Sequence, residues 1–283
     1  MKKTTLLFIF ILTCSYNIFG QNHKSDLEKK GFHGAIKQIK FIENIGNTIV
    51  KYNKQGMRVS RHVYDTEDKF KFSRDSYYNN KNLITKEEWF DTYDDSKSVI
   101  EYTYDNKNNL INKKRYKNGE LEHYYKFYYN DQNQMIKKEY YDDILKEIYK
   151  FTYDKKGRVK SENREEIRVN KVDKIYSYNE NNPLKYQIKI INHKRPHFNY
   201  IEYYILNDHG DFLESRTEDI NGKITDKVIR EYDKNHHLTK EISYYNGRFD
   251  YQKNYTYEYD LKGNIINTYI NKKLFLSSEI EYY

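Results

Sequence analysis

The chain has 283 residues, a net charge of +8 and 33% charged side chains, and it contains 33 Tyr and 14 Phe but only 2 Pro. Disordered chains are poor in aromatic residues, so this composition predicts a folded protein in which rings supply most of the buried area. Basic and acidic side chains are mixed (50 against 42), which disfavours a nucleic-acid-binding stripe. The densest basic segment, 193–197, is short, and we expect a solvated turn there.

Residues 1–20 have the pattern of a secretory signal peptide, because Lys2 and Lys3 precede an apolar run over residues 6–12. We expect cleavage after Gly20, which would give a secreted or periplasmic protein. The apolar run is too short to cross a membrane, and no later run approaches about 18 apolar residues, so we predict no transmembrane segment.

Cys14 is the only cysteine and lies inside this leader. Cleavage after Gly20 would leave no thiol, and therefore no disulfide and no Cys-based metal site or nucleophile. In the alternative interpretation, residues 11–14 (Ile-Leu-Thr-Cys) form a lipoprotein box and Cys14 is the lipid-modified N-terminus. After cleavage at Gly20, residues 21–34 are a short N-terminal entry segment before the repeats, in which only 24–30 show a helical pattern.

A Tyr-Asp or Tyr-Asn step recurs at intervals of 24 to 28 residues, and nine copies at nearly constant spacing indicate a repeat protein with a period of about 26 residues. The steps begin at Tyr52, Tyr78, Tyr104, Tyr129, Tyr153, Tyr178, Leu206, Tyr232 and Tyr259. A second turn signal, such as Asn118-Gly119, follows half a period later. The sequence therefore predicts two strands and two turns in each repeat.

Each Tyr-Asp step is followed by a predicted tight turn. Gly, Asn or His lies near the fourth place, as with Gly157, Asn108 and His237, and these residue types best tolerate positive φ. Asp or Asn at the first turn position, as in Asp154, can accept hydrogen bonds from the N–H groups of the turn.

The segments between turns alternate in the manner of strands, with Ile100, Tyr102 and Tyr104 on one face and Glu101 and Thr103 on the other. We therefore predict an all-β domain over residues 35–283. It is an antiparallel meander of about 18–20 short strands, curled into an elongated sheet or partial shell. Lys, Glu and Asn interrupt both faces, which disfavours an outer-membrane barrel with an apolar outer band.

The repeat units at 151–159 (Phe-Thr-Tyr-Asp-Lys-Lys-Gly-Arg-Val) and 257–265 (Tyr-Glu-Tyr-Asp-Leu-Lys-Gly-Asn-Ile) resemble the YD repeat of the Rhs family. The resemblance covers residues 35–283. It implies a secreted bacterial protein whose repeats form a curved β-sheet shell, in some members around a toxic C-terminal domain, and it implies a loose association with carbohydrate binding. The Asp-Pro-x-Gly-Leu type motif of toxin-bearing members is missing and no other domain follows Tyr283, so we expect no toxin delivery.

Two clusters could carry metal or acid–base chemistry. One is Asp208-His209-Gly210-Asp211 with Glu214, and the other is His236-His237. Both occupy ordinary repeat turns, where polar residues are expected for structural reasons, and we favour that interpretation. Adjacent histidines on a strand would also point to opposite faces, which makes them poor co-ligands.

The acidic pairs Asp94-Asp95 and Asp142-Asp143 lie near predicted turns, and the sequence gives no reason to place them across a cleft. Trp89, the sole tryptophan, lies at a strand position where aromatic residues recur, so we favour packing over a ligand platform. Nucleophile-elbow, phosphate-loop and zinc-protease motifs are missing from the sequence. We expect no cofactor, no bound metal and no catalytic residue.

The sequence thus predicts an exported, non-enzymatic binding or structural protein. Its tyrosine-rich faces favour a glycan or cell-wall fragment as ligand. One alternative is a protein-interaction shell that holds another secreted polypeptide through its aromatic face or open sheet edges, and another is a hydrolase with carboxylates across a groove. A localised site is expected where the repeat is broken, in the long step from Tyr178 to Leu206 that contains Pro183.

Overall fold

The computed structural model describes residues 25–167 and 169–283, so the signal peptide, its cleavage point after Gly20 and Cys14 lie outside the described residues. The described chain contains one short α-helix, one 3₁₀-helix and twenty strands. They are α1 (Asp26–Lys29), β1 (Ile36–Glu43), β2 (Gly46–Tyr52), β3 (Arg58–Tyr64), β4 (Phe70–Tyr78), β5 (Ile84–Asp91), β6 (Ser96–Tyr104), β7 (Leu110–Lys117), β8 (Glu120–Tyr129), β9 (Met135–Asp142), β10 (Ile144–Tyr153), β11 (Val159–Glu166), β12 (Asn170–Tyr178), β13 (Lys185–Asn192), η1 (Pro196–Phe198), β14 (Tyr200–Leu206), β15 (Phe212–Asp219), β16 (Ile224–Tyr232), β17 (Leu238–Tyr245), β18 (Arg248–Tyr259), β19 (Ile265–Ile270) and β20 (Lys273–Tyr282).

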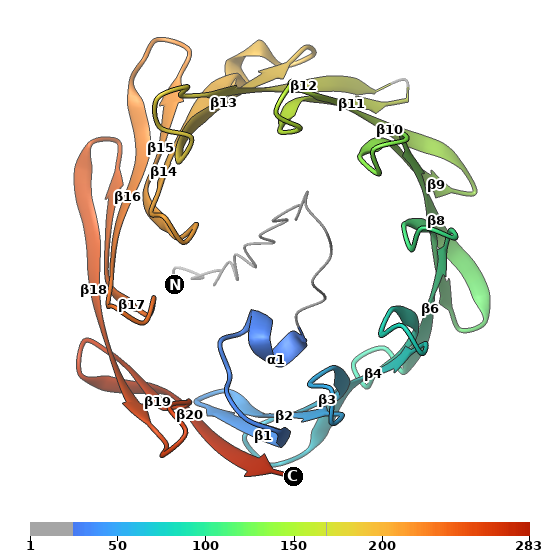
Figure 1. Cartoon of the computed structure of the whole chain (residues 1–283), viewed down its shortest axis with the longest axis vertical. Helices are drawn as coiled ribbons and strands as arrows, with labels where there is room; N and C mark the ends of the chain where they lie inside the picture. The colour runs from blue at the N-terminus through green and yellow to red at the C-terminus, as the bar shows by residue number, and fades with distance from the viewer. Residues whose placement is uncertain (1–24, 168) are drawn as a thin grey trace.

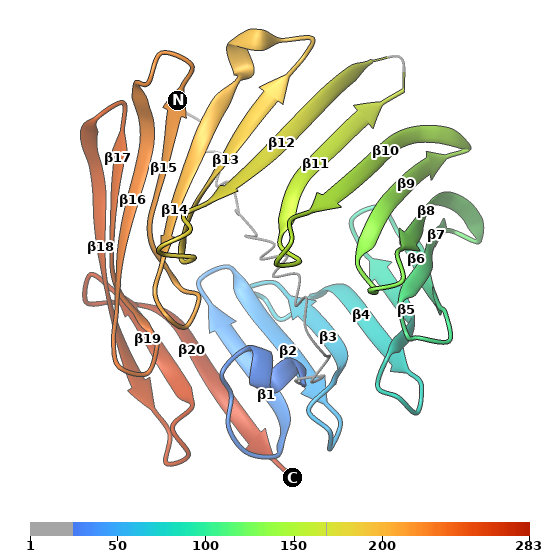
Figure 2. The ribbon, with the colours of Figure 1, turned by 45° about the horizontal axis from the view of Figure 1, so that its top comes forward.

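Every strand pairs antiparallel with the next one in sequence, which confirms the predicted all-β meander of about 18–20 strands. The prediction of an elongated sheet or partial shell is wrong, because β1 also pairs with β20 and closes the sheet into a barrel. Ile39 lies opposite Ile280 and Phe41 opposite Ser278 across this seam. Figures 1 and 2 show the strands following one another around a complete ring.

The curvature that closes the ring has a local cause at the Tyr-Asp steps. The register shifts by one residue at eight of the nine steps, as between Thr103 and Tyr104 or between Thr152 and Tyr153. Each shift is a bulge, and bulges bend a strand and increase its right-handed twist. Repeating the same bend once per hairpin curves the whole sheet in one direction. The Tyr-Asp turns lie toward the inside of the ring, whereas the half-period hairpins flare outward (Figure 1).

The apolar core of the molecule lies beside the seam. Helix α1 is inside the ring (Figure 1), and Leu27 packs with Ile36, Ile39, Val50 and Tyr52, all of which are buried. A capping box of Ser25 and Glu28 satisfies the N–H groups at the start of α1. The helical pattern predicted for residues 24–30 is therefore confirmed as a single turn.

Val50 and Tyr52 contact this internal helix, so their side of the sheet is the lumen face. Residues directly opposite in an antiparallel ladder project from the same face. The register therefore carries this assignment from strand to strand around the barrel. By the same rule, the alternate residues of each strand form the outer face.

Candidate functional site

The acidic or amide residue of each Tyr-Asp step is a turn cap. At seven steps its Oδ1 accepts hydrogen bonds from the N–H groups two and four residues later, as Asp154 does from Lys156 and Arg158 (both 2.9 Å). Burial would raise the pKa of Asp154, but these N–H groups and the Arg158 guanidinium outweigh burial and lower that pKa. The predicted capping role is confirmed.

The tyrosine of the step has a role that the sequence reading missed. We call the strand that follows each Tyr-Asp turn the return strand. The hydroxyl of the step tyrosine donates to a backbone carbonyl about twenty residues earlier, that of the first residue in the return strand of the preceding repeat. We call this bond the latch. The latches join Tyr78 to Arg58 (2.9 Å), Tyr104 to Ile84 (2.9 Å), Tyr129 to Leu110 (3.0 Å), Tyr153 to Met135 (2.7 Å), Tyr178 to Val159 (2.9 Å) and Tyr232 to Phe212 (3.1 Å). At the ninth step Tyr257, two residues before the step tyrosine Tyr259, makes the equivalent bond to Leu238 (2.6 Å). The regular recurrence of Tyr next to the turn was the signal from which this bond could have been inferred.

Both regular features fail at strand β13. Tyr178 lies directly opposite Tyr186 with no register shift, in the turn that contains Pro183. The step residue at the end of β14 is Leu206, which has no hydroxyl to donate, and the nearby Tyr204 hydroxyl donates to Glu202 instead (3.0 Å). In the described part of the chain, β13 is the only one of the return strands from β3 to β17 that receives no latch.

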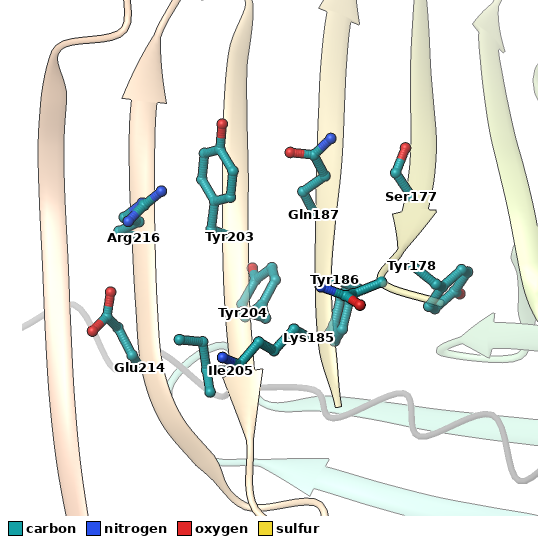
Figure 3. A pocket seen from close by; sticks show the side chains of 11 residues that line it. Ser177, Tyr178, Lys185, Tyr186, Gln187, Tyr203, Tyr204, Ile205, Glu214 and Arg216 are labelled. Atoms are coloured by element: carbon teal, nitrogen blue, oxygen red, sulfur yellow. The ribbon is translucent and has the colours of Figure 1, made fainter. Parts of the chain in front are cut away.

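A groove of about 380 Å³ lies at this irregular position, across β12 to β15. One row of its lining is formed by Ser177, Gln187, Tyr203 and Arg216, which lie opposite one another on successive strands and belong to the outer face. Figure 3 shows this row together with Tyr178, Tyr186 and Tyr204, the adjacent residues of the same strands, which form a second row on the lumen face of the sheet. In the second row the Tyr186 and Tyr204 rings stack with centres 5.0 Å apart, and the Tyr178 ring is tilted against Tyr186 at 5.9 Å.

The groove combines a held aromatic ring with free polar groups. The Arg216 guanidinium lies 4.3 Å from the ring centre of Tyr203, and it also pairs with Glu218 (3.0 Å). Burial and the Glu218 carboxylate raise the pKa of the Tyr203 hydroxyl. Among the described residues, the side chains of Ser177, Lys185 and Gln187 make no hydrogen bond or ion pair. Their hydroxyl, ammonium and amide groups are therefore available to a ligand.

The two predicted histidine clusters come together across adjacent repeats. The rings of His209 and His236 lie 3.8 Å apart, and His236 Nδ1 lies 3.2 Å from Asp211 Oδ2. His237 contacts Asp233 (3.4 Å) and the Tyr259 hydroxyl (2.8 Å) instead. No group of three or more metal-binding side chains in a suitable arrangement is present within residues 25–167 and 169–283.

The remaining candidates are at separate places. Glu214 lines the groove and pairs with Lys227 (3.2 Å). The acidic pairs are in half-period turns: Asp95 and Asp143 have positive φ, and a hydrogen bond from Lys117 lowers the pKa of Asp94 to about 2. The basic segment 193–197 is in the β13–β14 hairpin, where His193 Nε2 lies 2.7 Å from Asp173 Oδ2.

Trp89 is on the lumen face, away from the groove. Its ring has the Arg74 guanidinium 5.0 Å and the Arg115 guanidinium 5.3 Å from its centre, and Phe72 packs edge-on at 6.2 Å. It therefore has the packing contacts that the sequence predicted.

One protein family, described only as an uncharacterised protein, matches residues 32–137. No curated protein matches the sequence. Among solved structures, the chain is similar to TcdB2-TccC3-Cdc42 (8% identity, TM-score 0.35) over 81% of this chain and 16% of that chain. It is also similar to the Photorhabdus luminescens Tc holotoxin pore (8%, 0.33), over 82% of this chain and 16% of that chain.

A porin-like protein from Bacteroides uniformis ATCC 8492 is similar at 8% identity and a TM-score of 0.39, over 87% of this chain and 96% of that chain. The chain spans about 16% of the length of the toxin structures that it matches. Likenesses this distant carry no inference about activity or partners. Within the described residues, no helix has the length and apolar character needed to cross a membrane.

Proposed function

We propose that this protein is an exported, non-enzymatic, Rhs-like repeat protein that binds a glycan in the groove across β12 to β15. The observation that carries the proposal is the position of the groove, where both the bulge and the latch of the repeat are missing. The repeat departs from its regular pattern at β13, and the groove, which is large enough for a small ligand, forms at the same place.

The chemistry of the lining fits a sugar. Small-molecule sites combine apolar and aromatic surface with a few polar groups, and their volumes are commonly about 300–1,000 Å³. The Tyr203 ring offers a face for stacking on the C–H side of a sugar ring. The free groups of Ser177, Lys185 and Gln187 surround it with both donors and acceptors for hydroxyl groups.

The test is binding of the purified protein to a broad glycan array and to cell-wall fragments, followed by titration with the best ligand. Tyr203→Ala should weaken binding by about tenfold or more, because it removes both ring contact and a polar edge. Tyr93→Ala is the matched control, since Tyr93 is 97% exposed in the β5–β6 turn. Absence of binding across the array and the cell-wall fraction, or equal loss in both variants, would refute the proposal.

A second candidate function is supported by helix α1. The lumen wall holds a polypeptide segment through Leu27 and through Asp26, whose carboxylate accepts from the Arg58 N–H (2.8 Å). The inner wall of the ring already binds the N-terminal segment of its own chain, so it has a surface that could bind another secreted polypeptide. Sheet edges cannot serve this purpose, because the β1–β20 pairing occupies them. Co-purification from the native host, with mass spectrometry, separates this function from glycan binding.

A further inference from the structure

The lumen face of β3 to β7 carries a dense group of cations around Trp89. Arg61, Arg74 and Trp89 lie opposite one another on three successive strands, in the same cross-strand row as the core residue Val50. Like charges directly opposite in a ladder destabilise a sheet. The Arg61–Arg74 pair is therefore an unfavourable arrangement that the fold alone does not explain.

The positive charge of this region exceeds the negative charge that faces it. Five cations, which we call the basic cluster, meet there: Arg58, Arg61, Arg74, Lys113 and Arg115. One fully buried carboxylate, Glu87, receives Arg74 Nε at 2.7 Å and Arg58 at 3.7 Å, as well as the Tyr102 hydroxyl at 2.7 Å. Glu122 pairs with Arg115 at 2.9 Å. Asp26 also faces the cluster, because its carboxylate accepts from the Arg58 N–H (2.8 Å). Three carboxylates thus face five cations.

Two members of the basic cluster have no anionic partner in contact among the described residues. Arg61 makes no side-chain hydrogen bond or ion pair, and Lys113 has only the Tyr102 ring, 5.7 Å from its ammonium. Burial, followed by the nearby Arg58 and Arg74, lowers the pKa of Arg61. Burial also lowers the pKa of Lys113, and Arg74 and Arg115 add to this effect against an opposing contribution from Glu87.

Two buried donors in the same place lack an acceptor. The indole Nε1 of Trp89 and the Nε of Arg58 are buried without a hydrogen-bond partner in the described part of the chain. Buried polar groups in native proteins are almost always satisfied, so such a pair requires an acceptor from outside the chain. Indole, guanidinium and ammonium groups are donors only. The missing partner is therefore an acceptor, and the surplus positive charge favours an anion over a neutral acceptor.

We infer that the basic cluster is a binding site for an oxyanionic ligand that carries more than one phosphate or carboxylate group. Guanidinium groups match the paired oxygens of either anion, and several guanidiniums on neighbouring strands favour a multiply charged ligand over a single ion. The site is on the lumen face and is separate from the outer groove. A test of this anion site therefore does not depend on whether the protein binds a glycan in the groove.

The protein carries its own reporter for this site, because Trp89 is the only tryptophan. Tryptophan emission, excited beyond the absorption of tyrosine, should change when the purified protein is titrated with tripolyphosphate or with citrate, and calorimetry should give the affinity. The two anions distinguish phosphate from carboxylate recognition. Inorganic phosphate should bind more weakly than tripolyphosphate. No emission change and no heat with any of the three would overturn the proposal.

Arg61→Gln is the decisive variant. It should weaken binding of the preferred anion by about tenfold or more, as expected for the loss of a charge-assisted hydrogen bond. It should also raise the melting temperature of the ligand-free protein, because it removes an unpaired cation opposite Arg74. A purely structural role for Arg61 predicts the opposite shift in melting temperature.

The matched control is Arg248→Gln, an exposed arginine of the β17–β18 hairpin, which should bind anions like the parent. Equal weakening in both arginine variants would mean non-specific attraction to a basic protein and would refute the site. If Arg61→Gln failed to fold by circular dichroism, Lys113→Gln would take its place, and unchanged affinity in that variant would likewise refute the site.

Discussion

At the scale of single residues, the turns require backbone conformations that few side chains adopt. Asn82, Asn108, Asn133 and His236 have φ between +59° and +66° at equivalent turn positions, where Gly157 and Gly263 have φ of +78° and +82°. The sequence correctly indicated the residue types, and the histidine with positive φ is His236, next to the predicted His237. Left-handed backbone costs most residues with a Cβ roughly 1–2 kcal/mol, and Asn tolerates it better than most.

Asn82 allows a clean test of this requirement, since its side chain makes no hydrogen bond within the described residues. Asn82→Ala should lower the free energy of unfolding by about 1 kcal/mol, because alanine adopts positive φ less readily than asparagine, whereas Asn82→Gly should leave stability within about 0.5 kcal/mol. Chemical denaturation followed by circular dichroism gives both values. Asn80→Ala, in the same turn and exposed, is the control. Equal stability of the Ala and Gly variants at position 82 would contradict the argument.

At the scale of elements, the latch adds a side-chain bond at the end of a strand pair, beyond the last residues of the backbone ladder. Tyr104 ends β6, yet its hydroxyl reaches the carbonyl of Ile84 at the start of β5 (2.9 Å), so each latch ties one hairpin to the hairpin before it. Burial, with a smaller contribution from Tyr129, raises the pKa of Tyr104 to about 12. The hydroxyl therefore keeps its proton, and remains a donor, throughout the physiological range.

Tyr104→Phe removes only that hydroxyl. We expect the free energy of unfolding to fall by about 0.5–1.5 kcal/mol, the usual net value of one hydrogen bond. Tyr93→Phe changes an exposed ring and should have no effect, and urea denaturation compares the two. A Tyr104→Phe variant as stable as the parent would show that the latch does not contribute to stability.

At the scale of the whole molecule, the sequence predicted much of the fold because its signals are local. The turn residues and the alternation of the strands can be recognised within a single repeat of about 26 residues, and they recur in every repeat. Closure depends instead on contacts between the first and last strands, such as Ile39 opposite Ile280, and one repeat contains no information about how many repeats complete a circle.

The candidate sites divide in the same way. The groove at Tyr203 could be anticipated, because it sits at a break in the period between Tyr178 and Leu206. The basic cluster could not, because Arg61, Arg74 and Arg115 come from three strands whose relative register is fixed only in the folded sheet. Sequence alternation alone did not show which face of each strand would be enclosed.

The seam can be tested with a crosslink. Lys40 and Glu279 lie opposite one another on β1 and β20, with the ammonium 3.7 Å from the carboxylate. In a Cys14→Ser background, Lys40→Cys with Glu279→Cys should oxidise to an intramolecular disulfide, because directly opposed Cβ atoms lie about 4.5–5.5 Å apart. Peptide mass spectrometry detects the link. Only intermolecular or free thiols in the folded protein would contradict closure, and each single-cysteine variant is the control.

The reach of the latch has a consequence for the girth of the ring. Each latch tyrosine donates only to the repeat before it, and the seam has its own bond, from the Tyr283 hydroxyl to the Tyr52 carbonyl (2.6 Å). Adding a whole repeat between two latched neighbours would therefore lengthen the circumference by two strands and one latch without changing any existing latch. Fractional insertions would break the spacing. The circumference of such a ring can change only in whole hairpins, so the width of its lumen is set by the number of repeats in the chain.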